Sequence, residues 1–341
     1  MKKILIIIST LLLMSCSHMG YYWQAMGGQL EIISKRQSMD DVLAAPDTSS
    51  ELKQKLQYIQ RVRDFASREL QLPDNDSYRS YVDVNRPYLV WNVFAAPEFS
   101  LEPYQSCFLV VGCVSYRGYF NRQDAQAFAS ELEQQGYDVF VAGISAYSTL
   151  GWFDDPVPNT IIQNDNTQIA GLIFHELAHQ KIYVKNDTAF NESFAMTVEL
   201  AGVKQWLQGN GDPELYQQYL QDKQRRQEFI ALLMNARQKL AALYASDNAN
   251  KNEAKQIIFA ELRRDYESLK QGWNGDVRYD SFMSQQFNNA YFISVGLYFR
   301  YVDAFSKILE QQGNDWGRFY QKVSELQELS AKEREEYLKS L

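Results

Sequence analysis

Residues 171–180 read Gly-Leu-Ile-Phe-His-Glu-Leu-Ala-His-Gln, which places His175, Glu176 and His179 in an H-E-x-x-H motif on a helix predicted over 166–183. Residues four apart lie above one another on one helix face, so both imidazoles can reach a single ion. Glu176 is the only charged residue of this stretch, and a lone carboxylate is costly to bury without a partner such as a metal ion. The motif predicts a metal site in which Glu176 is the general base; a surface helix with a coincidental histidine pair is the alternative.

The third metal ligand is expected on the next helix. A catalytic zinc ion needs three protein ligands and one open position, and no histidine follows His179. The ligand must therefore be a carboxylate, or else a Cys or Tyr. If 184–187 forms a short turn between two antiparallel helices, His179 and Glu192 lie equally far from it and face each other. Asp187 and Glu199 are the rival ligands; Glu199 otherwise supports a ligand or is a solvated charge.

The rest of the sequence predicts an α+β fold that is predominantly helical. A small sheet at about 88–164 precedes the motif helix, and 165–341 is helical, within one domain over 51–341. Strands are predicted over 88–94, 108–116 and 138–143. Helices are predicted over 51–69, 124–135, 166–183, 188–207, 214–245, 251–271, 284–311 and 315–328.

The first fifteen residues have the pattern of an export signal. A positive start precedes an apolar run over 4–14 that is too short to span a bilayer with confidence. The run ends in Leu-Met-Ser-Cys, which resembles a bacterial lipobox, so Cys16 is expected to carry lipid and to begin the mature chain. Because Ser17 follows where Asp would favour the inner membrane, we expect an outer-membrane lipoprotein that faces the periplasm. Residues 16–50 would form a tether and lead-in; a plain signal peptide or a short signal anchor is the alternative.

Two cysteines remain in the body of the protein, Cys107 and Cys113. An exported compartment permits a disulfide between them, and Gly112 offers a bend in the chain. Their spacing does not match the CxxC pattern of a metal or redox pair. A structural disulfide is therefore expected, with two buried free thiols as the alternative.

Composition and charge exclude several classes of protein. Apolar residues make up 45% of the 341 residues, an ordinary globular composition that excludes disordered, collagen-like and coiled-coil proteins. The 34 basic and 42 acidic side chains give a net charge of −8. Because neutralising phosphates requires a basic face, nucleic acid is not an expected partner.

The motif followed by Glu192 resembles the gluzincin arrangement of zinc peptidases. More narrowly, the chain resembles the bacterial putative aminopeptidase family of exported proteins, many of which carry a lipobox. The segments that carry this resemblance are 21–25, 112–120, 175–180, 190–195 and 288–291. The resemblance implies a zincin-like fold and one Zn²⁺ ion per chain. The sequence departs from the gluzincin pattern at Met196, where an Asp would orient a ligand histidine.

Metal-assisted hydrolysis of peptide bonds is the expected activity, with zinc on His175, His179 and Glu192 and a peptide or protein as substrate. An oxyanion donor is also needed, and the candidates are Tyr116, Arg117, Tyr291 and Tyr298. An aminopeptidase further needs either an acidic residue for the substrate's α-amine or a blocked cleft. The candidate residues are Asp154, Asp155 and Glu199, and an unassigned carboxylate is the alternative. The strand over 138–143 and the segment 145–152 are placed to align substrate by backbone pairing. An envelope endopeptidase and a non-hydrolytic, metal-bearing scaffold or chaperone lipoprotein are the alternatives.

Overall fold

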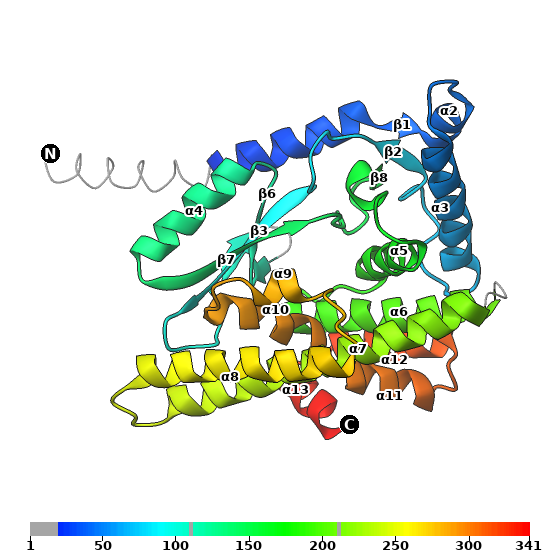
Figure 1. The fold of residues 1–341 in the computed structure, drawn as a ribbon. Helices are drawn as coiled ribbons and strands as arrows, with labels where there is room; N and C mark the ends of the chain where they lie inside the picture. Colours follow the sequence, from blue (N-terminus) through cyan, green and yellow to red (C-terminus); the bar gives the residue numbers. More distant parts are fainter. Residues whose placement is uncertain (1–19, 109–111, 210–212) are drawn as a thin grey trace, which may run out of the picture.

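The computed structural model describes residues 20–108, 112–209 and 213–341 (Figure 1). The chain is α+β and predominantly helical, which confirms the predicted class. The expected signal sequence and lipid attachment at Cys16 lie outside the described residues. No helix within the described residues combines the length and the apolar character that crossing a membrane requires.

The N-terminal part of the chain is helical over 20–35 and then joins a small sheet. In this sheet β1 (Gln37–Ser38) runs antiparallel to β2 (Ser80–Val82), and β2 runs parallel to β8 (Val157–Pro158). Two helices lie between the first two strands, α2 (Met39–Ala44) and α3 (Ser50–Arg68). Residues 20–50, the described part of the expected tether and lead-in over 16–50, therefore contribute a helix, a strand and a further short helix to the folded body.

The second sheet has the order β6-β3-β7, with β3 (Val90–Pro97) between β6 (Arg117–Tyr119) and β7 (Tyr137–Ile144). Successive side chains of a strand point to opposite faces, and β3 uses both faces. Trp91, Val93 and Ala95 pack against α4 (Arg122–Gln134). Phe94 and Ala96 pack against α10 (Asn289–Phe299) on the other side (Figure 1). The sheet is therefore a layer between two helices.

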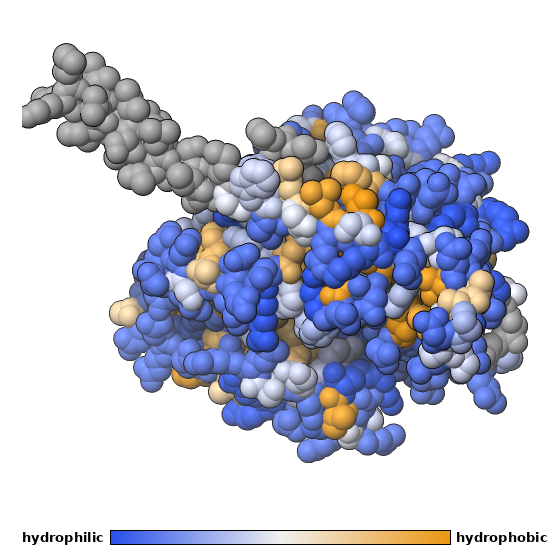
Figure 2. All heavy atoms as spheres, turned by 90° about the horizontal axis from the view of Figure 1, so that it is seen from above, coloured by the Kyte–Doolittle hydropathy of each residue, from blue (hydrophilic) through white to orange (hydrophobic). Residues whose placement is uncertain are grey.

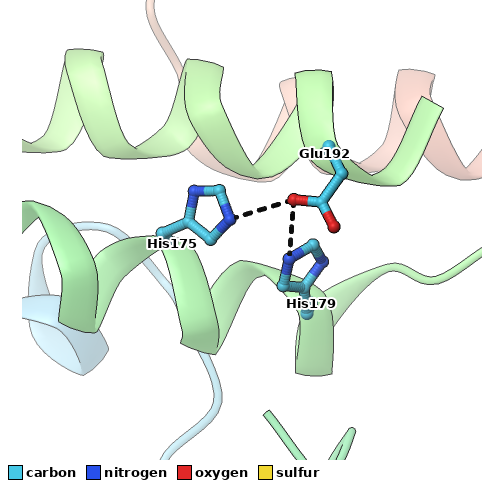
Figure 3. Close-up of side chains that lie close together, drawn as sticks. All are labelled: His175, His179 and Glu192. Carbon is cyan, nitrogen blue, oxygen red and sulfur yellow. Dashed lines mark ion pairs between the residues drawn. The ribbon is translucent and has the colours of Figure 1, made fainter. Parts of the chain in front are cut away.

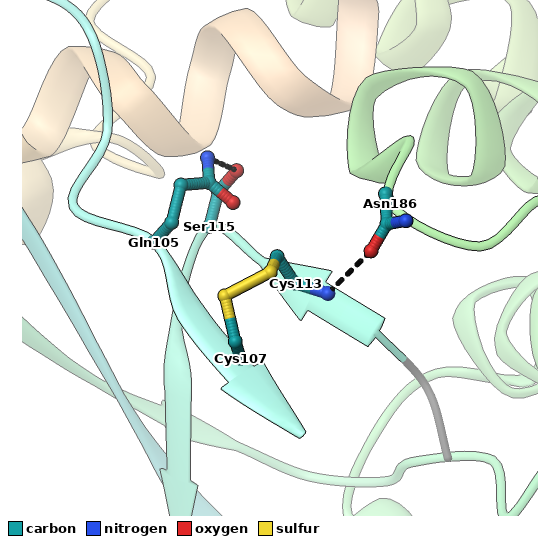
Figure 4. The surroundings of a disulfide bond; sticks show 5 residues. All are labelled: Gln105, Cys107, Cys113, Ser115 and Asn186. Atoms are coloured by element: carbon teal, nitrogen blue, oxygen red, sulfur yellow. Dashed lines mark hydrogen bonds between the residues drawn. A yellow bond between two sulfur atoms is a disulfide. The ribbon is translucent and has the colours of Figure 1, made fainter. Parts of the chain in front are cut away.

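The strand predicted over 108–116 is wrong. The structure has a hairpin of β4 (Ser106–Phe108) and β5 (Gly112–Val114), in which Cys107 pairs with Cys113 and Phe108 with Gly112. Gly112 has a φ of 79°, which an extended strand does not contain and which favours glycine. The apolar composition of 108–116 is continuous and does not indicate this reversal. A disulfide joins Cys107 to Cys113 across the hairpin, and Asn186 accepts a hydrogen bond from the Cys113 amide (Figure 4).

The helical half begins with α5 (Asn166–Lys181), which starts at a capping box made by Asp165 and Gln168 and packs against α6 and α3. The remaining helices are α6 (Thr188–Gly209), α7 (Pro213–Ala245), α8 (Lys251–Gly272), α9 (Asp280–Met283), α10, α11 (Val302–Gln311), α12 (Trp316–Gln327) and α13 (Ala331–Ser340). In Figure 1, α7 and α8 lie side by side along one edge of the molecule.

The single helix predicted over 284–311 is wrong, because residues 284–288 are not helical and the chain leaves the helix again between α10 and α11. Asn288 is extended and caps α10, accepting a hydrogen bond from the Ala290 amide. The Tyr301 amide donates to the Ser193 hydroxyl at 3.2 Å, which replaces a helical hydrogen bond between α10 and α11. Both interruptions depend on side-chain hydrogen bonds that the apolar periodicity does not encode.

Candidate metal centre

The α5–α6 pair brings three predicted ligands together. His175 and His179 lie one turn apart on α5, and Glu192 lies one turn into α6. The connection between the helices is fixed by Asn191, whose side chain exchanges hydrogen bonds of 2.7 and 2.8 Å with the backbone of Val184. These contacts fix the turn, and the turn sets the register between the two helices.

The three ligand atoms converge on one buried point (Figure 3). Glu192 Oε2 lies 3.3 Å from His175 Nε2 and 3.6 Å from His179 Nε2, and all three atoms lie within 4.8 Å of one another. Glu192 Oε2 is buried and makes no hydrogen bond with the described residues. Burial alone would raise the pKa of the Glu192 carboxyl, but His179 and His175 lower it to about 2. The group is a buried set of one ionised carboxylate and two imidazoles that could hold a metal ion.

The rival ligand Asp187 has a different role. One of its oxygens accepts a hydrogen bond from the Phe190 amide at the start of α6, at 3.1 Å. The other accepts from Arg334 Nε at 2.9 Å. Asp187 therefore caps α6 and pairs with α13, and it is not part of the group that could hold the ion.

Glu199 occupies the opposite side of the first histidine. Its Oε2 lies 3.2 Å from His175 Nδ1, and its Oε1 accepts a hydrogen bond from Arg226 at 3.4 Å. Gly171 makes room for this carboxylate, because a Cβ there would lie 3.1 Å from Glu199 Cγ. Nδ1 of His175 therefore has a carboxylate partner of its own, and Nε2 of the same ring points toward Glu192 and the position that an ion would take.

Glu176 is buried beside the same group, on the cavity side. Burial raises the pKa of its carboxyl, while the adjacent imidazoles of His175 and His179 oppose that rise. A carboxylate whose pKa is raised above its ordinary value is a better proton acceptor near neutral pH.

A cavity of about 500 Å³ opens in front of the ligands. Its wall is mostly aromatic and aliphatic, and it comes from the helical residues 20–35, from the β4–β5 hairpin, from the end of β7 and from α10. Residues that line it include Tyr21, Tyr22, Phe108, Val114, Tyr116, Phe120, Ile144, Tyr147, Leu150, Tyr183 and Tyr298.

Two of the four oxyanion candidates line this cavity. Tyr116 and Tyr298 are partly buried; this burial, and after it the negative charge of the nearby Glu192 carboxylate, raises the pKa of each phenol well above its usual value. Both phenols therefore stay protonated and can donate a hydrogen bond. The other two candidates do not line the cavity: Arg117 lies 4.1 Å from the ring of Tyr21 on the α4 side, and Tyr291 stacks on Phe140. The structure therefore does not bring these two candidates to the cavity, because tertiary packing turns them away.

The candidates for the α-amine anchor also lie outside the cavity. The Asp154 residue is exposed, and Glu199 is behind His175. Asp155 is buried and accepts hydrogen bonds from the Thr149 amide at 2.9 Å and from Gln180 at 3.4 Å. Burial raises the pKa of Asp155 to about 7. These carboxylates support the loop and α5, and the structure does not bring them to a substrate position.

Sequence reasoning missed most of the cavity wall. Tyr21 and Tyr22 carry only a resemblance to a family segment, Tyr147 lies within the segment 145–152 that is predicted to align substrate, and Tyr183 has no predicted role in the site. No spacing rule relates residues 20–35 to the motif helix 140 or so positions later. The available signal was the apolar pattern of Tyr21, Ala25, Gly28 and Ile32, which is the inward face of a helix.

The fold and the site define a predominantly helical α+β protein with a buried group that could hold a metal ion. The chain belongs to the putative aminopeptidase family, whose sequence profile matches residues 20–338. The family name supports peptidase activity at a coarse level. Comparisons with curated proteins and with solved structures gave no match.

Proposed function

We propose that this protein is a zinc-dependent peptidase, an aminopeptidase as its family name suggests. We also propose that it is exported and carries lipid on Cys16, which holds it at the outer membrane on the periplasmic side. The lipobox-like end of the apolar leader supports that location.

The position of Glu192 Oε2 carries the proposal. This oxygen is buried, makes no hydrogen bond with the described residues and lies 3.3 and 3.6 Å from two imidazole nitrogens. Ligand atoms around a tetrahedral zinc ion, at bond lengths of about 2.0–2.1 Å, are separated by about 3.3 Å. Two histidines and one glutamate are also a ligand set of known zinc peptidases. The residues present therefore fit zinc.

A bound zinc ion supplies Lewis-acid chemistry, polarising a carbonyl and acidifying water. Glu176 accepts the proton of the attacking water and then passes it to the leaving nitrogen, which its raised pKa favours. Tyr116 and Tyr298 face the same space as neutral donors and stabilise the oxygen on which negative charge develops. Glu199 holds the ring of His175 in place.

The cavity favours an apolar substrate side chain, because aromatic and aliphatic residues form most of its wall. The end of β7 and the segment beyond it, Ile144 to Leu150, run along this wall and are placed to align an extended peptide. Among the described residues that line the cavity, Glu176 and Glu192 are the only carboxylates. An α-amine therefore has no dedicated partner there, which favours an endopeptidase as the second candidate.

Metal content and peptide cleavage test the proposal. We expect one zinc per purified chain by ICP-MS, lost in His175→Ala and Glu192→Ala and kept in Glu261→Ala, which removes an exposed glutamate on α8. Glu176→Gln should keep zinc but cleave a peptide library about 10²–10⁴-fold more slowly.

Matched peptides with free and acetylated N-termini decide between the two peptidase types. Loss of cleavage on acetylation indicates an aminopeptidase, and equal cleavage indicates an endopeptidase. A chain that binds no zinc even when zinc is supplied contradicts the proposal, as does a Glu176→Gln variant with unchanged activity.

A further inference from the structure

The helical residues 20–35 lie along one edge of the molecule, and one face of this helix packs against the rest of the protein (Figure 1). Tyr21 and Ala25 on that face line the cavity in front of the ligands, and Ile32 is fully buried. Gly28 contacts Phe120 so closely that a Cβ at this position would lie 2.0 Å from the ring. The helix is therefore a fixed wall of the cavity.

The opposite face of this helix carries an exposed apolar stripe of Trp23, Met26 and Leu30, here called the outer stripe. The three residues are 67%, 56% and 61% exposed. Their spacing of three and four residues places them in one row on the helix. Seen from this side of the molecule, hydrophobic residues gather within a largely hydrophilic surface (Figure 2). Single exposed apolar residues are ordinary, but an aligned row on a helix is typical of an interaction surface.

We propose that the outer stripe lies on the surface of a lipid bilayer. The inference rests on the lipid proposed for Cys16 and goes beyond the peptidase activity. The helix includes Gly20, only four residues after Cys16, and four residues span at most about 14 Å. The lipid would hold this helix close to the headgroups, and the apolar side chains of the outer stripe point away from the rest of the protein. The bilayer is therefore the nearest surface that can cover them.

The side chains of the outer stripe suit this occupant. Trp is enriched at the membrane–water interface, and interfacial helices bury an apolar face about 5–10 Å deep. A helix with its side chains is about 10–12 Å across, so the cavity wall formed by Tyr21 and Ala25 lies one helix diameter from the bilayer. This geometry presents the cavity to peptide segments at the membrane surface.

Fluorescence quenching of Trp23 tests the contact. The full lipidated protein is reconstituted into vesicles of equal parts phosphatidylethanolamine and phosphatidylglycerol, with or without dibrominated phosphatidylcholine. Brominated lipid should quench part of the tryptophan fluorescence of the unsubstituted protein. In Trp23→Phe, most of this quenching should be absent. If brominated lipid does not quench the fluorescence that comes from Trp23, the proposal is overturned.

Hydrogen exchange of residues 20–35 in the same vesicles provides an independent measurement. The variant Trp23→Ser/Met26→Ser/Leu30→Ser should lose the protection that the unsubstituted protein gains from vesicles. The matched control Ile257→Ser, which removes a 53% exposed side chain from α8, should retain it. Circular dichroism checks that every variant is folded, which the exposure of these side chains leads us to expect.

Protection that disappears when the protein is diluted in excess lipid would assign the outer stripe to a second copy of the chain and overturn the proposal. If mass spectrometry finds no lipid on the N-terminus, flotation of the unmodified protein with the vesicles decides whether the outer stripe binds the bilayer. Loss of flotation in the triple variant then supports the contact, and failure of the unsubstituted protein to float overturns it. Peptide cleavage is not a readout in these experiments, so their failure leaves the peptidase proposal intact.

Discussion

Removing Glu199 should weaken metal binding without removing any ligand. The Glu199 carboxylate lies 3.2 Å from His175 Nδ1 and is held by Arg226. Glu199→Ala leaves a buried N–H without an acceptor, which costs about 1–3 kcal/mol. Loss of such a partner of a ligand histidine usually lowers metal affinity about 10–100-fold, or about 1.4–2.7 kcal/mol. Glu199→Gln keeps an acceptor and loses only the charge, so its effect should be below about tenfold.

Competition with a fluorescent zinc chelator at fixed pH and ionic strength measures these affinities. The control is Glu261→Ala, because Glu261 on α8 pairs with Lys239 on α7 and lies outside the site. The unsubstituted protein and the control should bind zinc equally tightly, Glu199→Gln more weakly, and Glu199→Ala most weakly. If Glu199→Ala binds zinc as tightly as the control does, while His175→Ala has lost zinc, the role assigned to Glu199 is refuted.

Two further predictions concern stability. Burial raises the pKa of Asp155 from 3.8 to about 7. Between these pH values the folded state therefore binds more protons than the unfolded state. The free energy of unfolding should fall as pH rises through this range, by up to roughly 4 kcal/mol. Asp155→Asn should flatten this decline in urea titrations from pH 4 to 8; an unchanged slope would contradict the assignment. Gly28→Ala should cost about 1–3 kcal/mol because its Cβ collides with Phe120, whereas Gly27→Ala, with open space around it, should be neutral or gain up to about 1 kcal/mol. Equal melting temperatures would show that the helix is not packed as described.

The ligand group was accessible to sequence reasoning because it depends on short-range geometry. His175 and His179 are related by one helical turn, and Glu192 by a short connection whose length could be counted. Each relation needs only helix boundaries correct to one or two residues, and the helix-forming composition supplies those. The cavity wall was not accessible, because Tyr21 reaches it from the other end of the chain.

The errors in the fold have a common physical origin. The predicted strand over 108–116 rests on its apolar run, and the predicted helix over 284–311 rests on its helix-forming composition and apolar period. Their interruptions depend on one glycine with positive φ and on polar side chains that replace backbone hydrogen bonds, Asn288 and Ser193. Such contacts involve single atoms and do not alter the apolar period.

The precision of the metal centre depends on how closely α5 and α6 approach, and two glycines permit that approach. A Cβ on Gly202 would lie 2.9 Å from the ring of Phe174, and a Cβ on Gly171 would crowd the Glu199 side chain. One glycine lies on each helix, and each receives a large side chain from the other. At either position a larger residue would crowd the facing side chain, so we expect the helices to move apart. The distances of 3.3 and 3.6 Å at Glu192 would then lengthen. The motif specifies which atoms can bind an ion, but these small residues determine whether the atoms are close enough to do so.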